Sequence, residues 1–217
     1  MQTTEERTIL NSGDFRSWLS HLTGPVTGPL GSDLVLRHFP STWSVPGYHE
    51  KKTAAVNPNS TDVDSMNRLL YEAYDLKTRR EFVPDSALRE QLFPERLRKT
   101  FHLDTFSDTT PFRAQLLHTG PAGNLYSLMA TGEIACNACD NNKRQTVDIW
   151  LLVADGRIAD LILVAYETGD DVEKEMRYYY LDPHHNLFMK DFTIGELSVS
   201  FNGEEKWHID KQFTKIR

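Results

Sequence analysis

Residues 144–167 read RQTVDIWLLVADGRIADLILVAYE and contain the strongest structural signal in the chain. Apolar side chains recur at every second position of the first half, which is the period of a β-strand with one buried face. They are Val147, Ile149, Leu151 and Val153. Asp155-Gly156 follows, and Asp-Gly between two alternating runs is typical of a two-residue hairpin turn. The stretch therefore predicts a β-hairpin with strands over 144–154 and 157–167.

Further strands surround this hairpin. Turn-forming residues separate the apolar runs from Leu125 to the C-terminus at intervals that suit short antiparallel connections. The expected strands cover residues 125–135, 144–154, 157–167, 176–181, 187–192, 197–201 and 206–213, with Asn202-Gly203 as the turn between the last two. The sequence predicts an α+β fold whose residues 124–216 form an antiparallel β-meander of six to seven strands. An NTF2-like or cystatin-like curved sheet would satisfy this order, as an analogy of architecture alone.

A helical period precedes the sheet, and helices are predicted within residues 61–102. The first carries an apolar stripe at three- and four-residue spacing and should end before Pro84, because proline disfavours helical geometry at the residue before it. The second starts at Asp85 or Ser86, and Pro94 inside it predicts a kink or two short helices. Two or three N-terminal helices are thus expected to pack on the meander.

Residues 1–59 are rich in turn-forming dipeptides such as Gly24-Pro25 and Pro46-Gly47. One short helix is expected there, with Asp14 as its N-cap and one apolar face. That face comprises Phe15, Trp18, Leu19 and Leu22. The segment has too few apolar positions to build its own core. We therefore expect residues 1–59 to be an extension packed on a single domain formed by residues 60–217.

The composition predicts an ordered, soluble and acidic protein. Of the 217 residues, 39% are hydrophobic and 25% are charged, which excludes the disordered class. The formal net charge of −7 disfavours a nucleic-acid-binding surface and suits a basic protein partner. No apolar run approaches the roughly 20 residues that a membrane-spanning helix requires. The first residues, MQTTEE, lack the features of a signal peptide.

Cys136 and Cys139 form a CxxC pair and are the two cysteines of the chain. They fall in an expected hairpin connection and not at a helix N-terminus, which disfavours a thioredoxin-type redox site. A zinc ion needs four ligands, of which this pair would supply half. The pair therefore predicts a disulfide and an oxidising compartment. We expect a periplasmic or secreted protein whose leader is not part of this sequence, with a cytoplasmic location as the alternative.

Two other groups of residues could carry chemistry. His184 and His185 follow Asp182-Pro183, where joint metal ligation would require an irregular turn because neighbouring strand residues point to opposite faces. Acid/base chemistry could use carboxylates that interrupt apolar strands and the histidines near them. These are Glu133, Asp148, Asp160, His118 and His208. Strand alternation alone would place such residues on the solvent face, and that is the preferred interpretation.

These observations favour a non-catalytic binding protein of the inhibitor or immunity type, with a protein partner. No catalytic residue, metal site or cofactor is assigned. Phe39, Trp43 and Tyr48 in the N-terminal segment are the expected partner-binding anchors. One alternative is a small enzyme with an acid/base site in the concave face of the sheet. The other is a metal-binding module that uses the CxxC.

Overall fold

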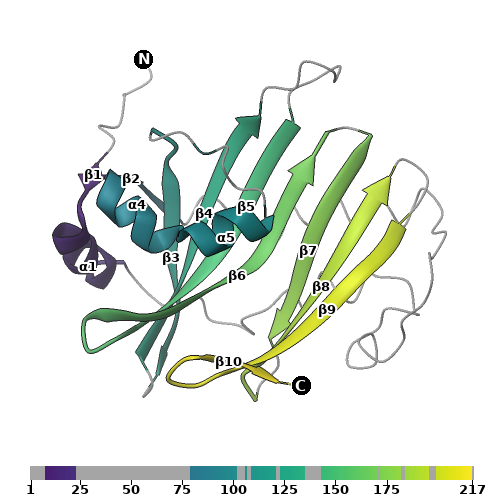
Figure 1. Cartoon of the computed structure of the whole chain (residues 1–217). Coiled ribbons are helices and arrows are strands. Elements are labelled where there is room, and N and C mark those ends of the chain that lie inside the picture. The colour runs from purple at the N-terminus through teal and green to yellow at the C-terminus, as the bar shows by residue number, and fades with distance from the viewer. Residues whose placement is uncertain are drawn as a thin grey trace.

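The computed structural model describes residues 8–22, 79–101, 106, 109–120, 123–134, 143–170, 172–181, 184–195 and 199–216. Most of these residues belong to one ten-stranded sheet, in which the strands follow each other in chain order (Figure 1). The strands are β1 (Ile9–Leu10), β2 (Arg80–Pro84), β3 (Phe112–Gly120), β4 (Gly123–Ile134), β5 (Lys143–Ala154), β6 (Arg157–Gly169), β7 (Glu173–Leu181), β8 (Asn186–Gly195), β9 (Val199–Ile209) and β10 (Phe213–Ile216). The helices are α1 (Ser12–Ser20), α4 (Ser86–Leu92) and α5 (Glu95–Phe101).

The sheet is antiparallel from β2 to β10, and β1 pairs in parallel with β2. The broad prediction of a sheet-rich α+β fold is confirmed. The predicted hairpin over 144–167 is also present. Asp155 and Gly156 both have positive φ, 49° and 68°, as a two-residue turn that matches the strand twist requires.

The expected meander of six to seven strands is too small, because three strands precede residue 123. Residues 80–84 form β2 and not the end of a helix. Phe82 is buried and Arg80 is exposed, and β2 pairs with β3 through Phe82 and Phe112. Neither strand was predicted, and for β2 the reason is that four apolar and charged residues before Pro84 fit either period equally well.

The C-terminal strands also differ from the prediction. Asn202-Gly203 makes no turn and lies inside the continuous strand β9. Asp191 of β8 pairs with Gly203 and Phe192 pairs with Phe201, so Asn202 is the extra residue of a β-bulge. The strands expected over 197–201 and 206–213 are therefore one strand, and β10 starts only at Phe213.

The helices follow the expected capping chemistry with one correction. Helix α1 begins after Asn11 and not after Asp14, because the Asn11 side chain accepts hydrogen bonds from the backbone of Gly13 and Asp14. Asp85 caps α4 by accepting from the backbone of Leu88. Phe93-Pro94 separates α4 from α5, so the two short helices expected at Pro94 are present. The predicted helix before residue 79 lies outside the described residues.

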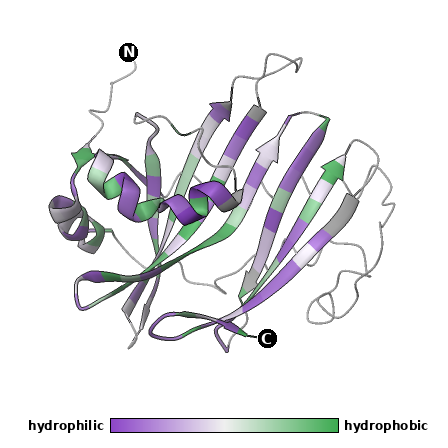
Figure 2. Ribbon diagram, viewed as in Figure 1, coloured by the Kyte–Doolittle hydropathy of each residue, from purple (hydrophilic) through white to green (hydrophobic). Residues whose placement is uncertain are grey.

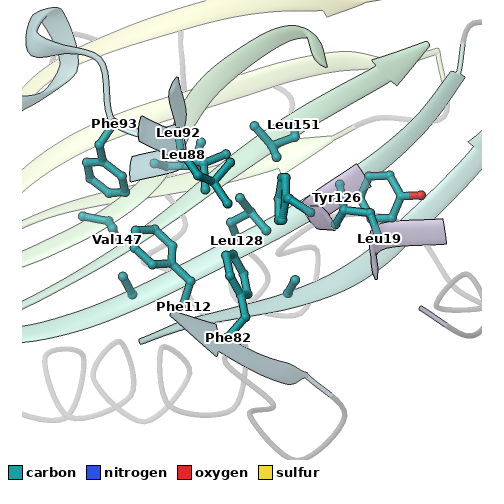
Figure 3. Packing of buried hydrophobic residues seen from close by; sticks show 14 of the residues in the cluster. Leu19, Phe82, Leu88, Leu92, Phe93, Phe112, Tyr126, Leu128, Val147 and Leu151 are labelled. Atoms are coloured by element: carbon teal, nitrogen blue, oxygen red, sulfur yellow. The ribbon is translucent and has the colours of Figure 1, made fainter. Parts of the chain in front are cut away.

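One apolar cluster, the helix-side core, lies where α1, α4 and α5 cover β2–β6 (Figure 1). Polar and apolar residues alternate along α4 and α5, which leaves each helix one apolar face for the sheet (Figure 2). Leu88 and Leu92 point from α4 toward Phe82, Phe112 and Leu128 of the strands (Figure 3). Each of these side chains contributes about 1.5–3 kcal/mol by leaving water.

Another apolar cluster, the opposite core, lies on the other face of the sheet and contains side chains from strands that are far apart in the strand order. It contains Leu117 and Leu125 from β3 and β4 together with Leu187 of β8, Ile209 of β9 and Phe213 of β10. Strands β3 and β10 are far apart in the strand order, so their side chains can share one cluster only if the sheet curves around it. A ring contact between His118 of β3 and His185, which precedes β8, supports the same curvature.

Candidate functional site

The ladder between β6 and β7 is short, and this gap positions the candidate site. Pairing runs from Tyr166↔Arg177 to Gly169↔Lys174, so the first half of β6 extends beyond its β7 partner. Strand β10 approaches β6 there, since the Phe213 amide donates to Asp160 Oδ2 at 2.9 Å. The gap between the strands therefore begins where the ladder ends at Arg177, and β10 approaches β6 again at Phe213.

A pocket of about 340 Å³ occupies this gap. Its walls come from β6, β7, β9 and β10, and α5 contributes one side. The lining residues are Arg96, Leu97, Asp160, Leu161, Ile162, Leu163, Arg177, Glu205, Trp207 and Phe213. The volume lies at the lower end of the range for small-molecule sites, about 300–1,000 Å³. Two aromatic residues, aliphatic residues from β6 and α5, and four charged residues make the lining amphipathic.

Arg177 is the buried charge of the pocket. Its Nε and Nη2 donate to the two carboxylate oxygens of Asp191, directly opposite on β8, at 2.6 and 2.8 Å. Nη1 donates to the Leu163 carbonyl at 3.3 Å, which satisfies a backbone group of β6 beyond the end of the ladder. The guanidinium carbon also lies 5.9 Å from the ring centroid of Tyr166. Arg177 thus connects the two sides of the gap.

Glu205 joins three partners at the mouth of the pocket. Its Oε1 accepts from Lys215 Nζ at 2.6 Å, and its Oε2 accepts from Trp207 Nε1 at 3.3 Å. Arg177 Nη1 lies 3.5 Å from the same Oε2. Lys215 Nζ is also 5.7 Å from the centre of the Trp207 ring, within cation–π range.

The electrostatics keep both central groups charged. Burial alone would raise the pKa of Glu205, but the Lys215 hydrogen bond and the Arg177 charge hold that pKa below its ordinary value. Burial alone would lower the pKa of Arg177, and its hydrogen bond to Asp191 raises it instead. Burial and the Asp191 charge raise the pKa of Tyr166 to about 12. Fixed charges of this kind orient a bound group and do not exchange protons near neutral pH.

A second arginine–carboxylate cluster is sealed, in the sense that both of its charged side chains are buried. Arg79 Nη1 donates to Ser127 Oγ at 2.6 Å, and Ser127 Oγ donates to Asp148 Oδ1 at 2.5 Å. Arg79 Nη2 lies 3.5 Å from Asp148 Oδ2, and both side chains are buried. Burial raises the pKa of Asp148, and the Arg79 charge and the Ser127 hydrogen bond offset part of that rise. Neither carboxylate oxygen faces the pocket described above.

The structure separates the residues considered for acid/base chemistry. Asp160 lines the pocket, but its two oxygens accept from the backbone amides of Leu161 and Phe213. His208 contacts Asn186, with 3.3 Å between Nδ1 and Oδ1, and Glu133 is exposed. His118 lies against His185. The expected solvent-face position is thus wrong for Asp148, which is buried because Arg79 compensates its charge.

Several sequence predictions fall outside the described residues. They concern Cys136, Cys139, Phe39, Trp43 and Tyr48. The disulfide and the N-terminal anchors therefore stay predictions. Among the residues that the structure describes, no three histidine, cysteine or carboxylate side chains are grouped so as to hold a metal ion. No helix within the same residues is long and apolar enough to cross a membrane.

Sequence reasoning missed Arg177, Glu205, Trp207 and Lys215. A signal for one of them was present, since Arg177 interrupts the apolar run Met176-Tyr178 as Asp148 interrupts its own strand. These residues come together because of the bulge in the β8–β9 ladder and because residues 157–165 of β6 have no β7 partner, and neither feature has a sequence signature.

Comparison with known proteins adds no family to this description. No family model matches the chain, and neither the curated proteins nor the solved structures compared with it yield a match.

Proposed function

We propose that this protein is a non-catalytic binding protein and that its partner binds in the pocket between β6 and β9–β10. The observation that carries the proposal is the composition of the pocket walls. Trp207 and Phe213 offer aromatic surface beside Leu161, and Arg177 and Glu205 supply fixed charges at the same place. Aromatic anchors with a few oriented polar groups are typical of binding sites.

The state of the charged groups favours binding over acid/base catalysis. A general acid or base needs a pKa near the working pH and an open path to its substrate. The pKa of Glu205 is lowered, and Asp148, whose pKa is raised, is buried against Arg79 away from the pocket. The carboxylate that lines the pocket therefore has a lowered pKa, and the one whose pKa is raised does not line the pocket.

The partner in this proposal is a basic protein, in a complex of the inhibitor or immunity type. The net charge of −7 would steer such a partner toward the molecule. An extracytoplasmic location belongs to the same proposal and rests on the predicted Cys136–Cys139 disulfide. Phe39, Trp43 and Tyr48 would provide a second contact. An NTF2-like or cystatin-like curvature of the sheet stays a prediction.

The pocket can be tested with small probes on protein labelled with ¹⁵N at the tryptophan indoles. Titration with benzyl alcohol and n-hexanol should shift the Trp207 indole resonance saturably. Trp18, which packs against Phe82 in the helix-side core, is the internal control and should not move. A Trp207→Phe variant assigns the resonance. If no probe gives a saturable shift at Trp207, the pocket is not a binding site and the proposal is wrong.

The extracytoplasmic and N-terminal parts need separate tests. Intact mass after thiol alkylation, with and without reductant, should show Cys136 and Cys139 blocked until reduction; free thiols in protein prepared without reductant would contradict an oxidising compartment. Deletion of residues 1–50 would remove Phe15 and Leu19 from the helix-side core and so destabilise the fold. Alanine substitutions at Phe39, Trp43 and Tyr48 are the cleaner test of that surface.

A further inference from the structure

One ammonium group contacts two of the residues that line the pocket, Glu205 and Trp207. Lys215 Nζ contacts Glu205 Oε1 at 2.6 Å and lies 5.7 Å from the centre of the Trp207 ring. A carboxylate and an aromatic face are the two groups with which proteins recognise an alkylammonium ion. The pair Glu205 and Trp207 therefore has the chemistry of an ammonium site, which a side chain of the same molecule fills.

The strand register explains why Lys215 reaches this place. Lys215 lies directly opposite Trp207 in the β9–β10 ladder, and Phe213 lies opposite Ile209. Side chains of directly opposite residues project from the same face. Phe213 lines the pocket, so Lys215, two positions further along β10, is presented beside it. The hydrogen bond from the Phe213 amide to Asp160 attaches β10 to β6 at the start of this strand.

The charged side chains of this site differ in how far they are exposed to solvent. The Lys215 side chain is 55% exposed, Glu205 is 27% exposed and Arg177 is 6% exposed. An exposed ion pair contributes little to stability because water screens it. The Lys215 ammonium can therefore leave at small cost, while Arg177 and the Trp207 indole continue to hold the Glu205 carboxylate in position.

We propose that Glu205 and Trp207 bind a lysine side chain of the basic polypeptide partner, and that Lys215 occupies this site until the partner displaces it. The proposal rests on the proposed function and names the group that the pocket recognises. The incoming ammonium replaces an equivalent ammonium, so the Glu205 carboxylate is never left without a counter-charge.

The apolar walls of the pocket favour a lysine side chain of a polypeptide over a small free amine. The aliphatic stem of a lysine would pack on Trp207 and Phe213, and apolar neighbours in the partner would reach Leu161. A volume of about 340 Å³ exceeds what one lysine side chain fills, so residues next to it are accommodated as well. The net charge of −7 attracts a chain with several basic residues.

The test is a titration followed at the Trp207 indole with the tripeptide acetyl-Leu-Lys-Leu-amide. The same peptide with an acetylated lysine side chain is the matched control, because it keeps the length and loses the charge. n-Butylamine tests whether the site binds a small free amine instead of a lysine side chain. We expect the charged peptide to bind the native protein, the acetylated peptide to bind at least about tenfold more weakly, and n-butylamine to bind more weakly than the charged peptide.

The Lys215→Met variant tests whether Lys215 competes with the peptide, because methionine keeps an unbranched apolar side chain and removes the ammonium group. Its affinity for the charged peptide should rise by about three- to tenfold, since the competing group is gone. Lys211→Met, an exposed lysine in the β9–β10 turn, removes the same charge and should leave the affinity within about twofold of the native value. Glu205→Gln should weaken the charged peptide and leave the acetylated one unchanged.

Three outcomes would overturn the inference. The Lys215→Met variant could bind the charged peptide no more tightly than the native protein, or the two peptides could bind equally. Binding of n-butylamine without the peptide would exclude a polypeptide source. In each case benzyl alcohol could still bind at Trp207, so the proposed function would survive. Only the loss of every saturable shift at Trp207 would remove both proposals.

Discussion

Two arginine–carboxylate clusters in this molecule have similar chemistry and opposite surroundings. The Arg79–Ser127–Asp148 cluster lies inside the sheet, with both charged side chains buried. The Arg177–Asp191–Glu205 cluster lies along the β6–β7 gap and ends in Lys215, which is half in solvent. A sealed ion pair adds little net stability and is costly to break, while an open one can exchange partners. Burial, and not residue type, therefore separates the sealed cluster from the open one.

The largest expected effect concerns the sealed cluster. Asp148→Ala leaves the Arg79 guanidinium buried without its carboxylate, which should lower the free energy of unfolding by about 3–5 kcal/mol. Urea denaturation measures the change. The double variant Arg79→Met with Asp148→Leu removes both charges and should recover most of the loss. A single-variant cost below about 1 kcal/mol would show that water reaches Arg79 and that the cluster is not sealed.

Arg177→Met tests the buried end of the open cluster. The substitution leaves Asp191 without its bidentate partner and removes a hydrogen bond to the Leu163 carbonyl. Because Asp191 is partly exposed, the expected loss of unfolding free energy is smaller, about 2–3 kcal/mol. Arg113→Met is the matched control, since Arg113 pairs with Glu81 at 3.2 Å in a half-exposed cross-strand pair. Its cost should stay within about 1 kcal/mol.

The two clusters should respond to pH with opposite signs. The folded pKa of Glu205 is lowered, so its contribution to stability is present above the unfolded pKa and is lost as pH falls through the folded pKa. The folded pKa of Asp148 is raised, so its contribution is greatest below the unfolded pKa and declines as pH rises toward the folded pKa.

The measurement is the free energy of unfolding from pH 3 to pH 7 for the native protein, Glu205→Gln and Asp148→Asn. The native advantage over Glu205→Gln should shrink as the solution is acidified. Its advantage over Asp148→Asn should grow over the same change. Parallel curves for the two variants would mean that the carboxylates do not differ in environment.

The smallest expected effect belongs to Lys215→Met. The ammonium of Lys215 is exposed, so its loss should change the free energy of unfolding by less than about 1 kcal/mol. Lys99→Met, which breaks the exposed pair with Glu95, should have a similarly small effect. A much larger loss for Lys215→Met would mean that Lys215 is needed to hold β10 in place and that a partner cannot displace it from Glu205.

Local patterns were sufficient for part of the fold. The alternation over 144–167 predicted the β5–β6 hairpin, and Asp155-Gly156 predicted its turn, because both signals depend only on neighbouring residues. Pro94 likewise predicted the division between α4 and α5. The same reasoning was wrong at Asn202-Gly203, where a good turn dipeptide forms a bulge because β8 pairs along the whole of β9. Long-range pairing outweighed the local turn preference there.

The candidate site was less predictable than the fold. Asp160 was noticed in the sequence and does line the pocket, but its carboxylate caps backbone amides. Arg177 and Glu205 are separated by 28 positions, and β8 runs between their strands. Their distance depends on the curvature of the sheet and on the end of the β6–β7 ladder. Neither quantity follows from the spacing of charges along the chain.

The sequence by itself determined the sheet-rich α+β class, the central hairpin and the helix breaks, because side-chain period, turn dipeptides and prolines act within a few residues. Only the tertiary structure decided which charges are sealed and which are open. The desolvation and pairing of a charge depend on the groups that folding brings around it. Asp148 and Glu205 are both strand carboxylates, and the groups that folding brings around them make one a structural carboxylate and the other a candidate ligand for an ammonium group.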